Sequence, residues 1–399
     1  AMAPSIRGEI ARLFGILGRL APRAVARSLS RTSVAVAALT IAISVIVGVS
    51  VMISSFRSTV GDWLLTTLGA DIYVSAPLLT SNRATVDVDP VVRDLVAAVD
   101  GVTEVSTSRA VSVIAPDQPD LPPVNLLAID FDIAPNRDFL WQTRADYQAA
   151  LEEGMVMVSE PFAFRRGITP ENNRITLLTD RGPRTFEIVG VYYDYATDQG
   201  TVAMLNSTYR PLWDDPFISS VGAFIAPDAD LTTVINDVRD ALTGYDMTVQ
   251  ANRELRTGVF EVFDDTFAIT VALRLLATVV AFIGILSSLL ALQLENTRQY
   301  GVMRAVGMTG RQLWGFTLLQ TGLMGLVAGI LAMPIGLALA LVLLFVINVR
   351  SFGWTMQFYF IPGEFGQAFA VALVAALLAG VYPAWRLTRL MTARALRSE

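Results

Sequence analysis

Long apolar runs alternate with polar segments along this chain, and four of the runs are long enough to cross a bilayer as helices. Each has the ~20 residues that a helix needs to span the hydrocarbon core. The runs are Ser33–Ser54, Ala268–Leu292, Thr317–Asn348 and Gly366–Trp385. Their interiors carry no charged side chain, and Arg274 lies near the outer end of the second run. Because ion-coupled transporters usually need ionisable groups at membrane depth, this pattern argues against an ion-driven pump or a polar channel.

The third run is too long for one straight span. It must tilt, kink at Pro334 or project beyond the lipid. It also contains Gly322, Gly325, Gly329 and Gly336. These glycines either allow close helix contact, as a GxxxG pair does, or reflect the ordinary tolerance of membrane helices for Gly, and the sequence leaves both interpretations open.

Residues 55–267 separate the first run from the second, and their pattern is typical of an α+β domain. The predicted strands are Ala70–Ala76, Val102–Ile114, Val124–Ile129, Met155–Ser159, Arg174–Leu178, Thr185–Tyr193, Thr201–Leu205 and Val221–Ile225. The predicted helices are Pro90–Val99, Asp146–Glu153 and Leu231–Leu242. The two longer helical patterns recur near opposite ends of the region, each beside strands, which permits two small subdomains.

The segment Arg253–Thr270 leads from this domain into the second apolar run. It keeps apolar side chains near helical spacing over its whole length. We therefore expect one continuous helix that leaves the bilayer, enters the α+β domain and can transmit motion between them.

Basic residues cluster beside the apolar runs. Residues 1–32, 294–316 and 386–399 together carry a net charge of +10, whereas the whole chain carries −6, so the remainder sums to −16. Basic residues near span ends set orientation, which predicts that both termini are cytoplasmic and that the acidic domain lies on the far side. Residues 5–20 predict an amphipathic helix on the inner leaflet, in preference to a simple basic leader.

The composition removes several kinds of chemistry. At 53% hydrophobic and 17% charged residues, the chain has the balance of an integral membrane protein with a sizeable polar part. It has no Cys, His or Lys. This excludes thiol nucleophiles, disulfides, His bases and the usual zinc or haem ligands. Without Lys there is no Walker A loop for ATP hydrolysis and no Schiff-base chemistry, so we expect no enzyme activity in this chain.

Two acidic pairs and one aromatic cluster are candidate sites. Asp214–Asp215 and Asp264–Asp265 are adjacent in sequence, and neighbours on a helix do not face each other, so surface solvation is favoured over an acid/base pair. The stretch Tyr192–Gln199 either contacts a partner or substrate or forms a strand end and turn, and the second interpretation is favoured.

The polar segment between the second and third apolar runs is Glu295–Trp314. It carries Arg298, Arg304 and Arg311 but only one acid. A short basic connection between spans faces the cytoplasm by the positive-inside rule, so we predict a polar helix at the inner membrane surface.

This segment resembles the inner segment of the FtsX-like permease family, which includes the MacB and LolC/LolE types of ABC transporter permease. The family pattern is E-R-x-x-E-x-x-x-L-R-A-x-G-x-x-x-x-Q. Here Glu295, Met303–Ala305, Gly307 and Gln312 match it, whereas Gln299 replaces the second Glu and Gly301 replaces a small apolar residue.

Two further parts of the chain resemble the same family. The ending Tyr382–Arg397 is similar to the family's P-A-x-R-A…EALR ending, and the region around Met155–Tyr195 is similar to the MacB-like periplasmic core domain. In long members with two four-span halves, the second half begins with an Arg-rich segment that Arg23–Thr32 resembles. With no Met at position 1, this suggests the C-terminal half of a doubled permease.

The resemblance implies a mechanism and a set of site residues. A separate cytoplasmic ABC ATPase dimer would hold the ATP and Mg²⁺, and this chain would hold no cofactor or metal. The expected ATPase-coupling residues are Glu295, Arg298, Gln299, Gly301, Met303, Arg304, Ala305, Gly307, Arg311 and Gln312. Docking is favoured over a purely topological role for Arg304, because it fits the family pattern, whereas both roles stay open for Arg298 and Arg311.

The expected fold is four transmembrane helices with both termini cytoplasmic and a large extracytoplasmic α+β domain between spans 1 and 2. The expected segments are 1–32 (amphipathic helix and basic junction), 33–54 (span 1), 55–267 (extracytoplasmic domain), 268–292 (span 2), 293–316 (coupling helix), 317–348 (span 3), 349–365 (outer loop), 366–385 (span 4) and 386–399 (tail). A bacterial inner-membrane location follows from the resemblance.

Two functions from different classes fit these features. The first is an ABC permease half that exports or extracts a lipid, lipoprotein or peptide-like substrate, and the large outer domain favours it. The second is a signalling or scaffold subunit that activates an extracytoplasmic cell-wall hydrolase. The implied partners are the ATPase, a second permease half, membrane lipids and a periplasmic substrate-binding or hydrolase partner, with no nucleic acid.

Overall fold

The computed structural model describes residues 20–21, 29–77, 86–131, 137–295 and 297–388. Most of the predicted amphipathic helix at 5–20, much of the Arg-rich junction at 23–32 and most of the tail lie outside these residues. The chain divides into two compact units, which are described separately. Unit 1 comprises Ala1–Ser55, Asp265–Leu344 and Phe358–Glu399, and unit 2 comprises Phe56–Asp264 and Phe345–Gln357.

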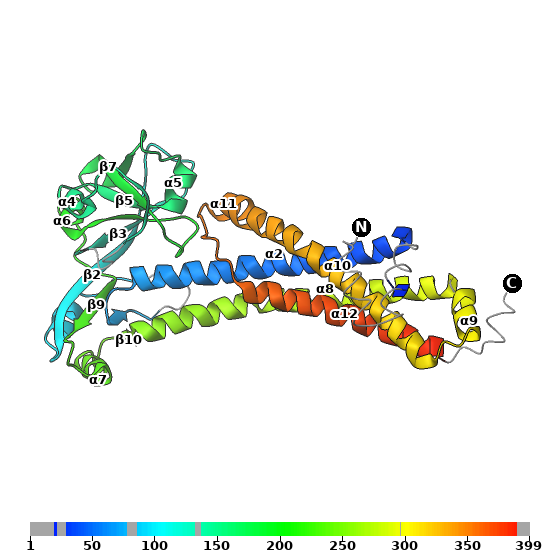
Figure 1. The fold of residues 1–399 in the computed structure, drawn as a ribbon. Helices are drawn as coiled ribbons and strands as arrows, with labels where there is room; N and C mark the ends of the chain where they lie inside the picture. The colour runs from blue at the N-terminus through cyan, green and yellow to red at the C-terminus, as the bar shows by residue number, and fades with distance from the viewer. Residues whose placement is uncertain (1–19, 22–28, 78–85, 132–136, 296, 389–399) are drawn as a thin grey trace. The chain divides into compact units, whose positions relative to one another are not determined.

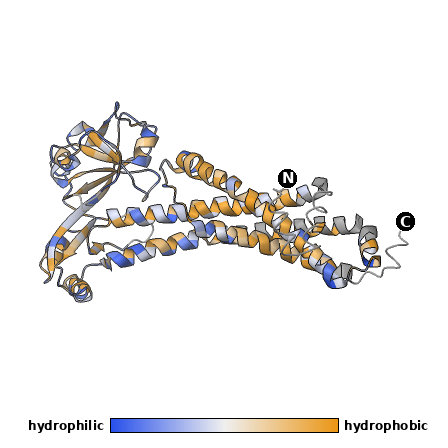
Figure 2. Ribbon diagram, in the orientation of Figure 1, coloured by the Kyte–Doolittle hydropathy of each residue, from blue (hydrophilic) through white to orange (hydrophobic). Residues whose placement is uncertain are grey.

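Long helices dominate the chain outside the sheet (Figure 1). They are α2 (Leu29–Thr67), α8 (Asn252–Glu295), α10 (Gly310–Val342) and α12 (Pro362–Thr388), with the shorter α9 (Thr297–Ala305) between α8 and α10. A π-helical stretch (Leu343–Asn348) and α11 (Val349–Phe352) continue α10 without a break. Figure 2 shows that α10 and α12 are apolar along most of their length, whereas the start of α8 is largely polar.

Three helices among the described residues are long and apolar enough to cross a membrane. They are Val36–Thr67, Gly310–Phe352 and Pro362–Trp385. The predicted spans that begin at Ser33, Thr317 and Gly366 largely fall within them. The fourth predicted span, Ala268–Leu292, is part of helix α8 but is not one of the three, so it and the orientation of the termini stay predictions.

The run from Gly310 to Phe352 is too long for the bilayer. Its 43 residues extend about 65 Å at 1.5 Å per residue, against a hydrocarbon core of about 30 Å. Tilt alone cannot contain that length, so the helix projects beyond the lipid. Pro334 lies inside it and does not end it.

Helices α2, α10 and α12 pack around one apolar core in unit 1. The buried residues that α12 contributes to this core are Ala368, Ala372, Ala376 and Ala379, and its Phe365 and Val371 pack against them half-buried. A Cβ atom added to Gly325 would come within 2.5 Å of the Cβ of Ala376, and one added to Gly336 within 2.6 Å of the Cβ of Val47. Both approaches are too close for any side chain, so these glycines serve helix contact and not mere tolerance.

Unit 2 contains one ten-stranded sheet. The strands are β1 (Ile72–Ser75), β2 (Val102–Val113), β3 (Val124–Ile129), β4 (Phe139–Gln142), β5 (Val156–Ser159), β6 (Arg174–Thr179), β7 (Gly182–Tyr192), β8 (Val202–Leu205), β9 (Ser220–Ile225) and β10 (Thr248–Ala251). Their order is β10-β1-β9-β2-β3-β8-β5-β7-β4, with β6 paired to β7. Eight of these strands were predicted, and the four-residue strands β4 and β10 were missed.

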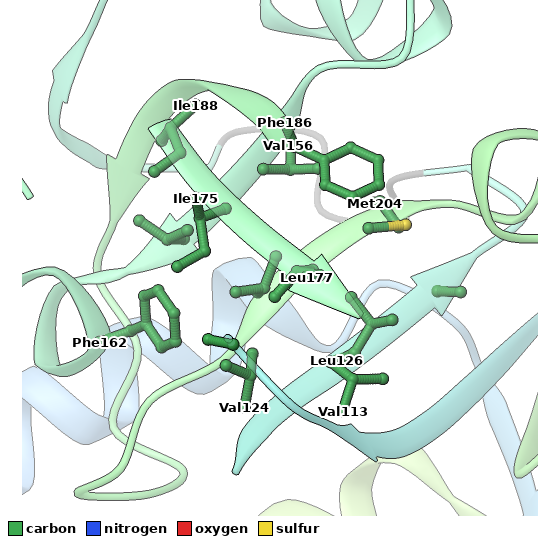
Figure 3. Packing of buried hydrophobic residues seen from close by; sticks show 14 of the residues in the cluster. Val113, Val124, Leu126, Val156, Phe162, Ile175, Leu177, Phe186, Ile188 and Met204 are labelled. Atoms are coloured by element: carbon green, nitrogen blue, oxygen red, sulfur yellow. The ribbon is translucent and has the colours of Figure 1, made fainter. Parts of the chain in front are cut away.

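The sheet has two lobes, each with its own core. One lobe packs α3 (Val91–Ala97) and α7 (Leu231–Ala241) against β1, β9 and β10. The other packs α5 (Glu160–Arg166) and α6 (Asn206–Tyr209) against the central strands, with Leu126, Phe162, Leu177 and Met204 in its core (Figure 3). Helix α4 (Tyr147–Glu152) covers part of the opposite face. The two longer predicted helices, from opposite ends of the region, therefore share one lobe, and the middle of the region forms the other.

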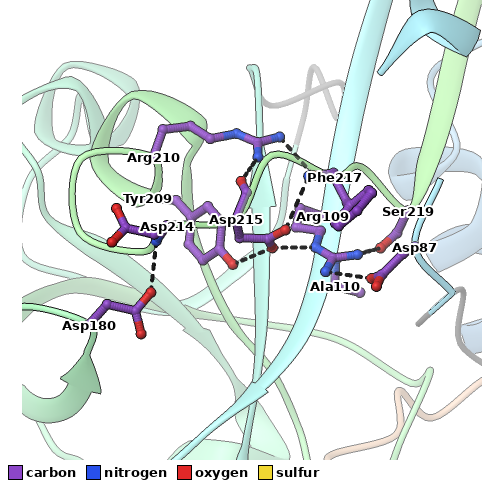
Figure 4. A network of polar contacts seen from close by, with 10 residues as sticks. All are labelled: Asp87, Arg109, Ala110, Asp180, Tyr209, Arg210, Asp214, Asp215, Phe217 and Ser219. Atoms are coloured by element: carbon purple, nitrogen blue, oxygen red, sulfur yellow. Dashed lines mark hydrogen bonds and ion pairs between the residues drawn. The ribbon is translucent and has the colours of Figure 1, made fainter. Parts of the chain in front are cut away.

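An ion-pair network braces the join between the lobes (Figure 4). Arg109 on β2 is only 6% exposed, and its guanidinium contacts Asp215 at 2.6 Å and Asp87 at 2.7 Å. The Tyr209 hydroxyl donates to the same Asp215 carboxylate at 2.8 Å. Burial alone would raise the pKa of Asp215, but the hydrogen bonds from Arg109 and Tyr209 outweigh it and lower the pKa.

The predicted surface role of the acidic pairs is thus correct for only part of them. The Asp214 side chain is 74% exposed and pairs with Arg181, whereas that of Asp215 is 17% exposed and holds Arg109. Asp264 is exposed and pairs with Arg57. The sequence pattern does not distinguish Asp214 from Asp215, because only the fold places Arg109 next to Asp215.

We predict that Asp215→Ala weakens the join by roughly 3–5 kcal/mol, because it leaves a buried guanidinium without its main partner. Hydrogen exchange of β2 peptides measures this as a lower opening free energy. The matched control, Asp214→Ala, removes an exposed carboxylate and should change it by less than about 0.5 kcal/mol.

The same contact has a pH dependence of known sign. Since the folded pKa of Asp215 is lowered, its contribution is present above the usual Asp pKa of about 3.9 and is lost as the pH falls through the lower folded value. Asp215→Ala should lack this acid-dependent part, and equal acid loss in both proteins would contradict the assignment.

Candidate coupling site

The predicted coupling segment is two helices joined by a tight turn. Helix α8 ends at Glu295, α9 spans Thr297–Ala305, and α10 begins at Gly310. The expectation of a single coupling helix over 293–316 is therefore corrected. We call residues Thr297–Phe316 the elbow.

Gly307 ends α9 in a left-handed conformation, with φ of +104°. The Met308 N–H donates to the Met303 carbonyl at 3.0 Å, and the Gly307 N–H donates to the Arg304 carbonyl at 3.1 Å. This is the Schellman pattern, in which a residue with positive φ lets the chain turn back on the last helical carbonyls. An L side chain is strained there, so the position requires Gly.

Thr309 and Gln312 start α10 with a reciprocal pair of hydrogen bonds. The Gln312 N–H donates to the Thr309 hydroxyl at 3.3 Å, and the Thr309 N–H donates to the Gln312 side-chain oxygen at 2.9 Å. This capping box satisfies two backbone donors that the first helical turn leaves free. Thr309 was missed in the sequence, although the T-x-x-Q spacing that signals such a box was present.

A small core fixes the angle of the elbow. Tyr300 on α9 packs edge-on against Phe316 on α10, with ring centroids 6.5 Å apart. Met303 and Met308 lie against the same cluster. Burial raises the pKa of Tyr300 to about 12, so the phenol stays neutral. The inner face of the elbow is therefore packed as a folded unit.

The predicted site residues separate into packed and exposed positions. Gly301 is buried, Met303 and Arg304 are half-buried, and Arg304 has a contact within the chain. Ala305, Gly307, Arg311 and Gln312 are exposed. Glu295 ends α8, and Arg298 and Gln299 lie in α9, but the structure does not describe their side chains.

An apolar ridge on α9 completes the exposed face. Val302 is 48% exposed and Val306 is 84% exposed, and their spacing of four residues puts them on one side of the helix. The sequence analysis missed both. Arg311, at the start of α10, is exposed as well.

We predict that Gly307→Ala destabilises the elbow by about 1–2 kcal/mol, because the added Cβ is strained at positive φ. Hydrogen exchange of the 303–312 peptide should show it. Gly258→Ala is the matched control. Gly258 lies inside helix α8 with no atom near its Cβ direction, so alanine should stabilise that helix by about 0.5–1 kcal/mol. Equal effects of the two changes would contradict the turn assignment.

A second polar contact ties the segment after α11 to the sheet within unit 2. Glu160, at the start of α5, accepts hydrogen bonds from the Thr355 N–H at 2.8 Å and from the Thr355 hydroxyl at 2.5 Å. The Tyr195 hydroxyl donates to the Thr355 carbonyl at 2.8 Å. We call this contact the Glu160–Thr355 junction.

Aromatic side chains and helix α2 surround the junction. Tyr195 lies 5.8 Å from Trp354 and 5.9 Å from Trp63, measured between ring centroids. The Gln357 N–H donates to the Thr59 hydroxyl at 3.2 Å. The Tyr192–Gln199 stretch does form a strand end and turn, as favoured, but its Tyr195 also binds a segment 160 residues away in sequence.

Glu160 is 6% exposed and carries a perturbed pKa. Burial raises the pKa, and the two hydrogen bonds from Thr355 offset this only in part. Since the folded pKa is raised, the associated stability is complete below the ordinary Glu value of about 4.3 and is lost as the pH rises through the folded pKa.

We predict that exchange of the Gly353–Gln357 peptide, corrected for its intrinsic rate, increases in the wild type as the pH rises above the ordinary Glu pKa of about 4.3. Glu160→Gln is neutral at every pH and can still accept from Thr355, so its exchange should be flat. Glu160→Ala, which loses both hydrogen bonds, should exchange quickly throughout. A slope in the Gln variant equal to the wild-type slope would refute the role of Glu160.

Comparison with known proteins identifies the helical part of the chain. The FtsX-like permease C-terminal domain matches residues 271–391, which run from within α8 past the end of α12. This domain belongs to the FtsX-like permease family. The chain is thus similar to this family over its C-terminal part, where two of the three helices that are long and apolar enough to cross a membrane lie.

The remainder of the chain also has a relative. Over 401 aligned residues the chain is 43% identical to an uncharacterized ABC transporter permease protein of Mycobacterium tuberculosis. The alignment covers 98% of this chain and 46% of the relative, so the chain spans about half the length of the relative. Placement as the C-terminal half of a doubled permease stays a prediction.

One solved structure matches part of this chain more distantly. It is the extracellular domain of the noncanonic ABC-type transporter YknZ from Gram-positive bacteria. The match covers 46% of this chain and 98% of that one, with a TM-score of 0.33 and 15% identity. At that distance the likeness carries no argument about this chain.

Proposed function

We propose that this chain couples ATP hydrolysis by a separate ABC ATPase to movement of unit 2, which exports or extracts a lipid, lipoprotein or peptide-like substrate. One observation carries the proposal. Both arms of the elbow continue, as unbroken helix or after a single residue, into long helices that lead to unit 2. These are Asn252–Glu295 and Gly310–Phe352. A rotation of the elbow would therefore be transmitted along these two stiff helices.

The end of each long helix farthest from the elbow is held by the sheet or by a helix packed on it. Helix α8 begins one residue after β10, and the segment after α11 is held at the Glu160–Thr355 junction. Rigid helices with anchored ends transmit displacement, whereas flexible linkers would absorb it. This supports transmission of force, and it gives the junction a mechanical purpose.

The nucleotide chemistry is assigned to the partner. The chain has no Lys and hence no Walker A loop, so ATP and Mg²⁺ would be bound by a cytoplasmic ATPase dimer. The exposed ridge of Val302 and Val306 with Arg311 is the proposed docking surface. In this arrangement Gly307 and Gln312 shape the elbow and contribute to docking through its geometry.

The proposed setting is a bacterial inner membrane, with a second permease half beside this chain and unit 2 outside the cytoplasm. The competing function is a signalling subunit that activates a cell-wall hydrolase. A ten-stranded sheet with two lobes is large for a signalling contact, which favours substrate handling.

We predict that Val306→Glu and Arg311→Glu each reduce ATP hydrolysis stimulated by the chain about tenfold, equal to about 1.4 kcal/mol of lost contact. The measurement uses the co-purified ATPase in lipid nanodiscs. Arg184→Glu, an exposed charge reversal on β7, is the control and should leave the stimulation unchanged. Normal stimulation in both elbow variants would overturn the docking surface.

A further inference from the structure

The sheet of unit 2 carries large side chains on one face and small ones at the centre of the other. Strand β2 alternates between them. Val113 packs into the core, while Ser106, Ser108 and Ala110 point the opposite way and line a cavity. Buried sheet faces are normally filled to close packing, so a row of small residues leaves a hollow.

Neighbouring strands repeat this pattern. On β9, Val221 and Ala223 join the core, and Ser220 and Gly222 line the cavity. The cavity has a volume of about 360 Å³, within the ~300–1,000 Å³ typical of sites for small molecules. This volume is too small for a helix, whose diameter is about 10 Å with side chains.

Apolar side chains form most of the cavity rim. They come from β3, β5 and the residues that directly follow α2 and β3, namely Leu127, Ile129, Met157, Leu68 and Phe131. Such a wall suits an alkyl or aryl body, and the hydroxyls of Ser108 and Ser220, which also line the cavity, bond to each other at 2.6 Å. An apolar body is therefore the expected content of the main cavity.

One end of the cavity is polar. Trp63, Thr67 and Arg137 also line a second hollow, which adds Asp62 and Asp138. Asp194 lies in the wall of the main cavity. Three carboxylates against one guanidinium leave an excess of negative charge, which suits a cationic head and disfavours an anionic one.

Trp63 supplies the second, independent observation. Its Nε1 atom is buried and has no hydrogen-bond partner among the described residues. A buried donor without an acceptor is unfavourable and rare, and it points to a group that occupies the site. An oxygen on the head of a ligand would satisfy it.

We propose that this cavity binds a single-chain amphiphile whose head carries an amine and a hydrogen-bond-accepting oxygen. The alkyl body lies over β2 and β3, the oxygen accepts from Trp63, and the amine lies near Asp62, Asp138 and Asp194. Binding is independent of the coupling mechanism, whereas the role of this ligand as the transported substrate rests on the proposed function.

The test uses the full chain in lipid nanodiscs without ATPase. The probe is N-aminoethyl dodecanamide with a diazirine on its alkyl chain, cross-linked by light and mapped to peptides. Cross-links should fall on β2 and β3. Unlabelled N-aminoethyl dodecanamide should compete for them, and dodecanoate should compete at least about tenfold less well.

Two variants test the cavity and its head-group contact. Ala110→Phe fills the hollow and should reduce cross-linking about tenfold or more, while Thr103→Phe, exposed on the same strand and outside the cavity, should leave it intact. Trp63→Phe should weaken the amide probe about fivefold but leave dodecylamine, which has no such oxygen, unchanged. Exchange of β2 peptides confirms that each variant is folded.

Several results would overturn the proposal. They are cross-links confined to the apolar helices, full cross-linking in Ala110→Phe, or equal competition by dodecanoate. If Trp63→Phe weakened the binding of N-aminoethyl dodecanamide and of dodecylamine equally, the assigned contact between Trp63 and the ligand oxygen would be wrong. The cross-linking assay contains no ATPase and is therefore independent of the ATPase assay on the elbow variants. If cross-linking persists but the elbow variants stimulate ATP hydrolysis normally, only the coupling proposal is contradicted.

Discussion

The pairing of strand β2 with β9 on one side and β3 on the other is the constraint on which unit 2 depends. The first half of β2 pairs with β9 and the second half with β3, both antiparallel, which joins the two lobes into one sheet. Without this strand each lobe would keep its core but lose its fixed relation to the other. The Arg109–Asp215 ion pair lies where the two lobes meet. Separating the lobes would leave a buried charge without its partner, which costs free energy, so the ion pair opposes that separation.

The same strand creates both a filled face and a hollow one because side chains alternate along it. Its Val113 enters the core, and Ser106, Ser108 and Ala110 face the cavity. The two faces therefore have separate purposes. One supplies the burial that stabilises the domain, and the other gives up packing contacts to leave room for an apolar ligand next to Trp63. The hollow at the polar end of the cavity is lined by Tyr195 and Gln357, which also belong to the surroundings of the Glu160–Thr355 junction. A ligand in the cavity would therefore lie next to this junction within unit 2.

Helix continuity governs the remainder of the chain. A bilayer requires every backbone group to be satisfied within the helix, and continuous helices meet this requirement while also being stiff. The chain turns sharply at the elbow, where Gly307 and the Thr309–Gln312 box satisfy the exposed helix ends. Two positions of the family pattern, Gly307 and Gln312, are thus explained by backbone geometry. The exposed Val302, Val306 and Arg311 are the proposed docking surface.

The sequence alone determined the apolar helices, eight of the ten strands and the continuous helix that begins near Arg253, because these depend on local periodicity and length. It also located the segment with Gly307 and Gln312, though not the turn between two helices. Only the tertiary structure decided which of two adjacent aspartates is buried, that Tyr195 meets Thr355, and that the small residues of β2 and β9 surround one cavity. These depend on contacts between residues far apart in sequence. Periodicity specifies which side of a strand a residue occupies, but not what lies opposite it.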